Sequence, residues 1–195
     1  MSARDNILSR LRAVEVTEVA KPQLDFAHIC FDERVVHFAE MVRSVGGEVV
    51  EMAESLETTL KTLLGEDIKL VSPLEELQDR ALNPYDVADV HELGGEYVAV
   101  VEGGVGIAEN GAVWVPIDGR RKAHLFACQH LVIVLNKEHI VDTMHDVMKQ
   151  ISLDNLDYGA FVSGPSKTAD IEQALVMGAH GAMKATIILY SESFR

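Results

Sequence analysis

Hydroxyl and ammonium side chains follow one another closely between Ser163 and Thr168, and a histidine comes soon after, at His180. Backbone N–H groups at a helix start, together with such side chains, can hold an anion such as a phosphate or a carboxylate. A plainer interpretation is that these residues only form a turn and a helix cap. Both interpretations stay open. The candidate ligand-binding residues are Ser163, Gly164, Ser166, Lys167, Thr168 and Gly181.

The same stretch predicts the elements that would position these side chains. A strand ends at Ser163, a tight turn follows, and the apolar spacing predicts a helix over 169–177 with Thr168 as its N-cap and a glycine as its stop. We expect the turn at the carboxyl end of a parallel strand, where open α/β sheets bind ligands. Asp170 falls in the first helical turn, where a carboxylate opposes a bound anion. We therefore expect Asp170 to be structural, bonded to the turn or to Lys167.

Glu109 and His180 are the candidate catalytic residues. Glu109 stands between a predicted strand and the turn Asn110-Gly111, in which Gly111 is expected to be structural. A glutamate in a tuned environment can act as a nucleophile or a base, although an exposed strand-end acid is the simpler interpretation. His180 lies between small residues and belongs to the residue type that titrates near neutral pH. A histidine in a turn with no chemical part is the alternative.

Known nucleotide and metal motifs are absent from the sequence. In the glycine stretch from Gly103 to Gly111, Glu109 occupies the place of the third glycine of a dinucleotide fingerprint, and no Gly-Lys-Ser/Thr follows. The eight histidines show no local zinc spacing, and two cysteines cannot hold a four-cysteine iron–sulfur cluster. We expect no metal and no cofactor bound by the chain's own motifs. Cys30 and Cys128 lie in apolar runs, which predicts buried, reduced thiols.

Composition disfavours two classes of partner. The 195 residues carry a formal net charge of −14, which opposes binding to nucleic acid and to an anionic membrane surface. No apolar run approaches the roughly 20 residues of a membrane span, and the first residues show no apolar signal core. We therefore expect a cytoplasmic protein with no nucleic-acid partner and no membrane span.

Helical and strand-like patterns alternate along the chain, which predicts a mostly parallel sheet with helices on both faces. Predicted helices cover 4–14, 33–44, 54–64, 73–80, 137–151 and 169–177. Predicted strands cover 26–31, 48–52, 68–71, 97–101, 105–109, 112–116, 131–135, 160–163 and 184–190. Asn110-Gly111 predicts a two-residue hairpin, so the stretch 103–116 is expected to be a local antiparallel exception. We expect residues 1–20 to be an N-terminal helical segment and 21–195 a single α/β domain.

Four sequence blocks resemble the LUD domain of lactate-utilization proteins, and within that family the lactate-utilization protein C type. The most specific block is Ser-Gly-Pro-Ser-Lys-Thr-Ala-Asp-Ile-Glu at 163–172, continued by Val-Met-Gly-Ala-His-Gly at 176–181. Weaker blocks are 106–111, 130–134 and 38–47. Three positions depart from the family pattern: Ala182 replaces a proline, Phe126-Ala-Cys128-Gln replaces a Leu-Pro segment, and Asn110 replaces a threonine.

The resemblance implies a three-layer α/β/α fold, similar to 5-formyltetrahydrofolate cyclo-ligase and to CoA transferases. It implies a part in the oxidation of L-lactate to pyruvate, in a complex with an iron–sulfur subunit and another redox subunit, the clusters being held by the partner. Two alternatives stay open. One is a stand-alone CoA or acyl-transfer enzyme, because Glu109-Asn110-Gly111 resembles the turn that carries the glutamate nucleophile of CoA transferases. The other is a module that binds a small anionic ligand or nucleotide at the Ser163–Thr168 turn.

Overall fold

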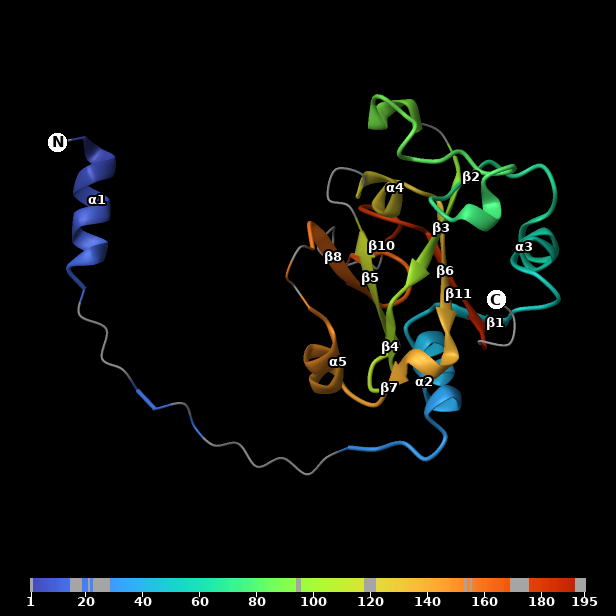
Figure 1. Cartoon of the computed structure of the whole chain (residues 1–195), viewed down its shortest axis with the longest axis horizontal. Coiled ribbons are helices and arrows are strands. Elements are labelled where there is room, and N and C mark those ends of the chain that lie inside the picture. Colours follow the sequence, from blue (N-terminus) through green and yellow to red (C-terminus); the bar gives the residue numbers. More distant parts are fainter. Residues whose placement is uncertain are drawn as a thin grey trace.

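The chain folds as an α/β protein with two main sheets (Figure 1). One is a five-stranded parallel sheet and the other is a four-stranded mixed sheet. A separate two-stranded ribbon comes between the last strands of the two sheets along the chain. The computed structural model describes residues 2–14, 19–20, 22, 29–93, 96–117, 122–152, 154, 156–168 and 176–191.

The parallel sheet has the strand order β1-β11-β6-β3-β2. Its bounds are β1 Glu48–Glu51, β2 Leu70–Val71, β3 Val98–Gly103, β6 His130–Asn136 and β11 Lys184–Tyr190. The central strands are apolar runs because a strand covered on both faces has no side towards water. β11 pairs residue by residue with β6, from Lys184 beside His130 to Tyr190 beside Asn136. The predicted strand 184–190 is confirmed without a shift, and the other strands of this sheet are confirmed within a few residues.

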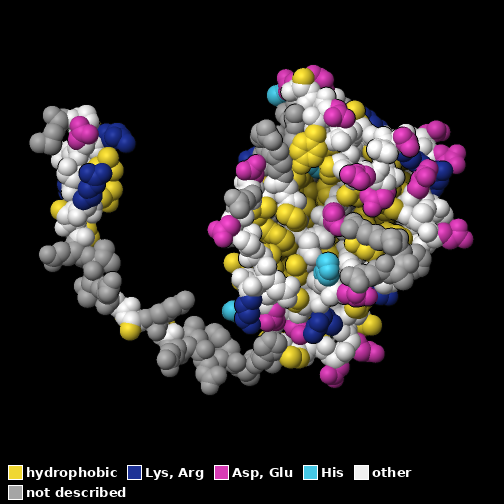
Figure 2. Space-filling model, viewed as in Figure 1, with side chains coloured by type: hydrophobic (Ala, Val, Ile, Leu, Met, Phe, Trp, Pro, Cys, Tyr) yellow, Lys and Arg dark blue, Asp and Glu magenta, His cyan; other side chains and the backbone are white. Residues whose placement is uncertain are grey.

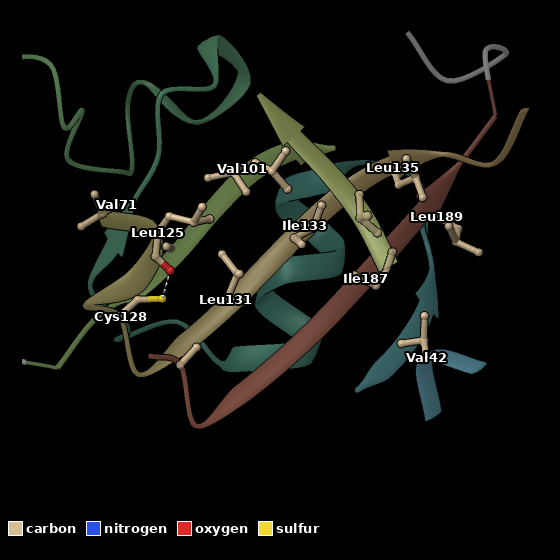
Figure 3. Close-up of a cluster of buried hydrophobic side chains, with 14 of the residues drawn as sticks. Val42, Val71, Val101, Leu125, Cys128, Leu131, Ile133, Leu135, Ile187 and Leu189 are labelled. Atoms are coloured by element: carbon tan, nitrogen blue, oxygen red, sulfur yellow. Dashed lines mark hydrogen bonds between the residues drawn. The ribbon is translucent and has the colours of Figure 1, made fainter. Parts of the chain in front are cut away.

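Helices cover both faces of the parallel sheet. The helical elements are α1 Ala3–Arg12, α2 Arg34–Ser44, α3 Leu56–Leu64, α4 Ala123–Phe126, α5 Met144–Gln150 and the 3-10 turns η1 Glu75–Leu77, η2 Val90–Leu93 and η4 Lys137–His139. Ile133 of β6 lies in a hydrophobic cluster with Val42 of α2 (Figure 3). Its neighbour Val132 faces the opposite side and lies in a cluster with Leu60 of α3. The prediction of helices on both faces is therefore confirmed.

The smaller sheet shares one of these faces with α2. Its order is β7-β4-β5-β8, with bounds β4 Val105–Ile107, β5 Ala112–Ile117, β7 Ile140–Val141 and β8 Tyr158–Val162. Val113 and Val115 of β5 are buried in the same cluster as Ile133. This layer of the molecule is therefore part helix and part sheet, whereas the sequence predicted helices alone.

The β4–β5 hairpin is confirmed, but its predicted two-residue loop is wrong. Ile107 pairs with Ala112, so the four residues 108–111 connect the strands. The backbone N–H of Gly111 donates to the Ile107 carbonyl, and that of Glu109 donates to the Asp142 carbonyl, each at 2.9 Å. The loop is longer than predicted because the backbone of Glu109 bonds to Asp142 and not to β5.

The predicted helix over 137–151 is wrong over its first half. The chain forms η4 and then β7, and α5 begins only at Met144. Ile140 of β7 is 1% exposed and pairs with Gly106 of β4. Burial and strand pairing at this position outweigh the local helical pattern, as tertiary context commonly does.

In the predicted strand–turn–helix around Ser163, the strand is confirmed as β8, but the helix is wrong at its described end, residues 176–177. Lys167–Thr168 form β9, which pairs antiparallel with β10, Val176–Met177. Thr168 is therefore a strand residue, and the predicted cap at this position depends on residues outside the described part of the chain. Gly178 has a positive φ of +74° but follows β10 instead of ending a helix. Residues 169–175, with Asp170 among them, lie outside the described residues.

The N-terminal helix is confirmed as α1, which buries none of its residues and lies apart from the sheets in Figure 1. The predicted strand over 26–31 falls mostly outside the described residues, and residues 29–31 form no strand. Cys30 is exposed, contrary to prediction, whereas Cys128 is buried as predicted. In the described part of the chain, no helix combines the length and apolar character that a membrane crossing requires.

Two glycines with positive φ fix α2 against the smaller sheet. A Cβ at Gly111 (φ +66°) would lie 2.6 Å from the backbone nitrogen of Val42, and one at Gly164 (φ +67°) would lie 2.6 Å from the carbonyl oxygen of Val45. Each clash is with helix backbone, which cannot move aside as a flexible side chain can. The helix can approach this closely only because both positions lack a side chain.

We predict that Gly111→Ala lowers the free energy of unfolding by about 2–5 kcal/mol, through left-handed backbone strain and a steric clash with α2. Gly46→Ala is the matched control: φ is +82°, but the nearest atom is the flexible end of Lys167 at 3.3 Å. It should cost only about 1–2 kcal/mol. Urea unfolding of both variants measures the difference, and equal losses would show that contact with α2 is not the constraint.

Candidate functional site

Glu109 lies in the loop between β4 and β5 and is bonded to the start of α5. Its Oε2 accepts a hydrogen bond from the backbone N–H of Met144, the first residue of α5, at 3.0 Å. A carboxylate is favoured there because the first N–H groups of a helix have no partner within the helix. The side chain remains exposed. Glu109 thus joins the hairpin loop to α5.

The Ser163 block lies directly beside this loop. Ser163 Oγ donates to the Asn110 carbonyl at 3.1 Å. Gly164 packs on the C-terminal end of α2, and Gly111 packs on the same helix one turn earlier. Four predicted site residues, Glu109, Gly111, Ser163 and Gly164, are therefore brought into one neighbourhood from two distant segments.

Lys167 completes the contact with α2. Its Nζ donates to the carbonyl oxygen of Val45, the C-cap residue of that helix. A positive charge is favourable at a helix C-terminus, where the carbonyl groups have no partner within the helix. The ammonium group predicted to hold an anion is thus bonded to a backbone oxygen.

Ser166 meets the loop that precedes β11. Its N–H donates to the Ala182 carbonyl, and its own carbonyl accepts from the Gly178 N–H, both at 2.9 Å. A Cβ at Gly181 would lie 3.1 Å from the Cβ of Ser166, so the glycine permits a close approach. His180 is exposed in the same loop. Ser166 and the His180-Gly181 pair therefore form a second neighbourhood within the predicted site.

The predicted position of this cluster, at the carboxyl end of a parallel strand, is wrong. β8, which leads into it, pairs antiparallel with β5. The cluster contacts Gly46 and Ala182, which closely precede β1 and β11. It therefore lies at the amino edge of the parallel sheet, where its described contacts hold α2 and the β11 loop in place.

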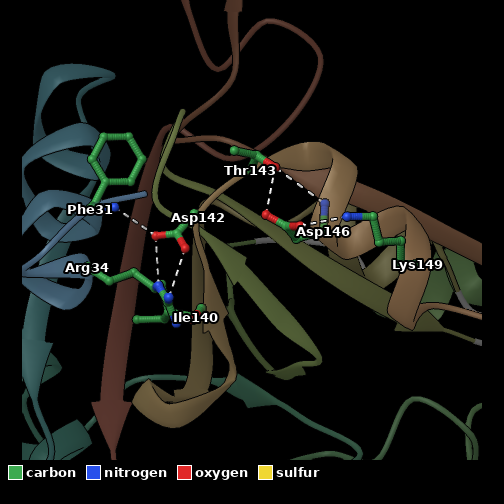
Figure 4. Close-up of polar contacts among 7 residues, drawn as sticks. All are labelled: Phe31, Arg34, Ile140, Asp142, Thr143, Asp146 and Lys149. Atoms are coloured by element: carbon green, nitrogen blue, oxygen red, sulfur yellow. Dashed lines mark hydrogen bonds and ion pairs between the residues drawn. The ribbon is translucent and has the colours of Figure 1, made fainter. Parts of the chain in front are cut away.

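An ion pair that sequence reasoning missed fixes Asp142, whose carbonyl bonds to Glu109. Arg34 Nε and Nη2 donate to the two carboxylate oxygens of Asp142 at 2.9 and 2.8 Å, and the Phe31 N–H donates at 3.1 Å (Figure 4). Asp142 is 5% exposed, and the Arg34 guanidinium lowers the pKa of its carboxyl group. The partners are 108 residues apart, so no local pattern could reveal the pair.

A second polar cluster lies at the amino edge, on the face that α3 covers. His130 Nε2 and Thr186 Oγ1 are 2.8 Å apart, and Thr186 Oγ1 donates to Glu48 Oε2 at 3.4 Å. Burial lowers the pKa of His130; the Lys184 ammonium lowers it further, and the Glu48 carboxylate opposes both. His130 is the first residue of β6, directly before the predicted strand over 131–135. The sequence could not reveal the partners, which come from neighbouring strands.

Cavities open at both ends of the parallel sheet. The one at the amino edge has a volume of about 580 Å³ and is lined by His130 and Lys184, among others. The one at the carboxyl edge, beside the start of α3, has a volume of about 250 Å³. Its acidic lining residues are Glu54, Glu57, Glu76 and Glu102. Acidic side chains are also spread over the face shown in Figure 2. An anion is therefore disfavoured at the carboxyl edge.

No group of three or more His, Cys, Asp or Glu side chains that could hold a metal ion occurs within the residues that the structure describes. Burial raises the pKa of the Cys128 thiol to about 11, so this cysteine is a protonated core residue at neutral pH. The buried Cys128 thiol is therefore a core group, and the polar cluster at His130 offers hydrogen bonding.

Comparison with known proteins assigns most of these residues to one family. Residues 97–190 match the family model of the LUD domain. This part of the chain is a LUD domain. It contains the smaller sheet, three strands of the parallel sheet, Glu109, His130 and the Ser163–Gly181 block. The resemblance first seen in that block is confirmed.

Two curated relatives are distantly similar to the chain, and both are named lactate utilization protein C. The protein from Oceanobacillus iheyensis is 34% identical over 91 residues, which cover 43% of this chain and 39% of the relative. The protein from Geobacillus sp. is 31% identical over 102 residues, which cover 49% of this chain and 42% of the relative. The matches thus span about two fifths of the relatives' length.

A solved structure has a similar fold. A DUF162 family protein from Deinococcus radiodurans matches with a TM-score of 0.53 and 13% identity, over 80% of this chain and 96% of that chain. At this identity the likeness establishes the fold alone.

We predict that Asp142→Asn lowers the free energy of unfolding by about 1–3 kcal/mol at pH 7, because a charged acceptor for Arg34 is lost. A carboxyl group with a lowered folded-state pKa stabilises above its unfolded pKa of about 3.9, and this stabilisation disappears as the pH falls through the folded-state pKa. The gap between wild type and variant should therefore shrink below about pH 4. Urea unfolding from acid to neutral pH measures it, with Asp79→Asn, an exposed carboxylate, as the control. A gap that is constant with pH would contradict the assignment.

Proposed function

We propose that the chain takes part in the oxidation of L-lactate to pyruvate as a subunit that acts beside an iron–sulfur subunit and another redox subunit. The observation that carries the proposal is the LUD domain at residues 97–190, together with 31–34% identity to two proteins named lactate utilization protein C. In this proposal the clusters and the electron transfer belong to the partners, and the chain works in the cytoplasm.

We propose further that residues 21–195 act as one LUD-type domain behind an N-terminal helical segment, residues 1–20. Its relation to the three-layer folds of 5-formyltetrahydrofolate cyclo-ligase and CoA transferases is part of the same proposal. The support is a parallel sheet with α3 on one face and α2 on the other. The smaller sheet beside α2 would then be the feature that sets this chain apart from a purely helical outer layer.

We predict that deletion of the gene abolishes growth on L-lactate in a strain that has no other lactate dehydrogenase, while growth on pyruvate is unaffected. Growth on pyruvate is the control because it bypasses only the oxidation step. Re-expression of the wild-type chain should restore growth on lactate. Normal growth of the deletion strain on lactate would refute the proposal.

The proposed assembly has a direct biochemical readout. An affinity-tagged chain should retain a partner that contains iron and acid-labile sulfide, and the purified chain alone should contain neither. Recovery of the chain without any iron–sulfur partner, from cells that grow on lactate, would count against the assembly and leave the growth phenotype as a separate question.

Acyl transfer by Glu109 is the second candidate function, and the exposure of this side chain is the observation that favours it. The hydrogen bond from Met144 to Oε2 weighs against it because it occupies one carboxylate oxygen in a structural contact. The bond from Lys167 to Val45 similarly weakens the third candidate, an anion or nucleotide module at the Ser163–Thr168 turn.

Acyl transfer predicts a thioester between CoA and Glu109 when the protein is incubated with acyl-CoA. Hydroxylamine or borohydride would then modify Glu109, which mass spectrometry detects, and Glu109→Gln would remain unmodified. We expect no modification, because the proposed subunit does not use Glu109 as a nucleophile. A modified Glu109 in the wild type would establish the second candidate instead.

A further inference from the structure

We propose that the cavity at the amino edge of the parallel sheet binds a 2-hydroxy acid with an apolar side chain. Lys184 pairs with the carboxylate, and His130 accepts a hydrogen bond from the hydroxyl group. The inference deepens the proposed function and rests on it in one respect: lactate is a simple member of this class of acids.

Strand register places the two polar groups side by side. His130 of β6 is the direct partner of Lys184 in β11, and Glu48 of β1 is the direct partner of Thr186. Because side chains alternate along a strand, Lys184 and Thr186 share a face of β11, and this face belongs to the cluster that packs on α3. The cavity is lined by His130, Lys184 and Glu48 from three adjacent strands.

The hydrogen-bond chain sets which imidazole nitrogen carries the proton. Thr186 is 1% exposed, and its hydroxyl donates to Glu48, so it accepts from His130 Nε2–H. The remaining nitrogen, Nδ1, is then the acceptor of the neutral ring. The lowered pKa of His130 keeps the ring neutral at neutral pH. The site therefore offers an acceptor that suits a hydroxyl donor.

Lys184 offers a carboxylate an ammonium group at the cavity wall, although three of the other charged lining groups are acidic. Within the described residues, Lys184 has no ion-pair partner, whereas Glu48 is bonded to Thr186 and the ammonium of Lys69 donates to the Leu93 carbonyl at 3.3 Å. The other charged lining groups are Asp67 and Glu96. A bound carboxylate would thus neutralise a strand-end ammonium that the sheet holds next to a neutral imidazole.

The size and the apolar walls of the cavity indicate which side chain the hydroxy acid carries. A volume of about 580 Å³ lies within the range of small-molecule sites and exceeds what a three-carbon acid fills. The apolar lining residues are Leu63, Leu64, Ile68, Val98 and Met183. A branched aliphatic side chain on the hydroxy acid would contact them and bury apolar surface.

Calorimetric titration of the purified chain at pH 7.5 tests the site with a matched pair of probes. 2-Hydroxy-4-methylpentanoate carries the hydroxyl donor, and 2-oxo-4-methylpentanoate has the same skeleton without it. We expect the hydroxy acid to bind about tenfold more tightly, the effect of one hydrogen bond, and more tightly than L-lactate. Equal affinity for the two acids, or no binding of either, would overturn the proposal.

Variants separate the two polar contacts. Lys184→Gln should weaken both acids about tenfold, because the charged contact is common to them. His130→Phe should remove the preference for the hydroxy acid. Lys137→Gln and His139→Gln change the same residue types at the opposite end of β6, in η4, and should bind as wild type. If His130→Phe does not fold, Lys184→Gln on the exposed strand end still decides, and unchanged affinity in that variant refutes the site.

Failure of this inference and failure of the proposed function give different results. A chain that binds neither acid but is required for growth on lactate would leave the function standing without this site. A chain that binds the hydroxy acid but is dispensable for growth on lactate would keep the site and refute the function.

Discussion

The register between β6 and β11 is the constraint on which the rest of the structure depends. Seven residues of β11 pair with seven of β6, and alternate side chains enter two separate hydrophobic clusters. A shift by one residue would send Ile187 towards α3 and the Thr186 hydroxyl into the cluster of α2. It would also separate His130 from Lys184. The packing of both faces and the polar cluster at the amino edge are therefore fixed by the same pairing.

The residues that carry the family resemblance contribute mainly to the placement of α2. Gly111 and Gly164 allow its backbone to approach closely, and Lys167 binds the carbonyl at its C-terminal end. Glu109 and Asp142 connect the same region to α5. A recognisable sequence block can therefore reflect a demanding helix contact as well as a ligand site. In this chain the described contacts of the block are mostly with backbone carbonyl groups.

Local sequence patterns correctly predicted the elements whose buried positions in the fold match the spacing of their apolar residues. The strand 184–190 and the helix now seen as α2 are examples, because each presents its apolar residues at the spacing that its position demands. The helix over 137–151 failed because Ile140 pairs with Gly106, an interaction between segments far apart in sequence. The end of the predicted helix over 169–177 failed for the same kind of reason, since Val176 and Met177 form β10, which pairs with β9. The ion pair of Arg34 and Asp142 and the chain from His130 to Glu48 are likewise products of tertiary structure, which single-sequence periodicity does not contain.

β11 lies in the interior of the parallel sheet, although it is the last of the described strands along the chain. Thr186, which bonds to Glu48, comes 138 residues after it. During synthesis, β1 and one edge of β6 therefore remain unpaired until residues 184–190 have left the ribosome. Strand pairing over so long a sequence separation slows folding, and the unpaired strand edges expose apolar surface to other chains. The sheet is thus completed only after residues 184–190 have been translated, so the edges that β11 will cover stay open to other chains until then.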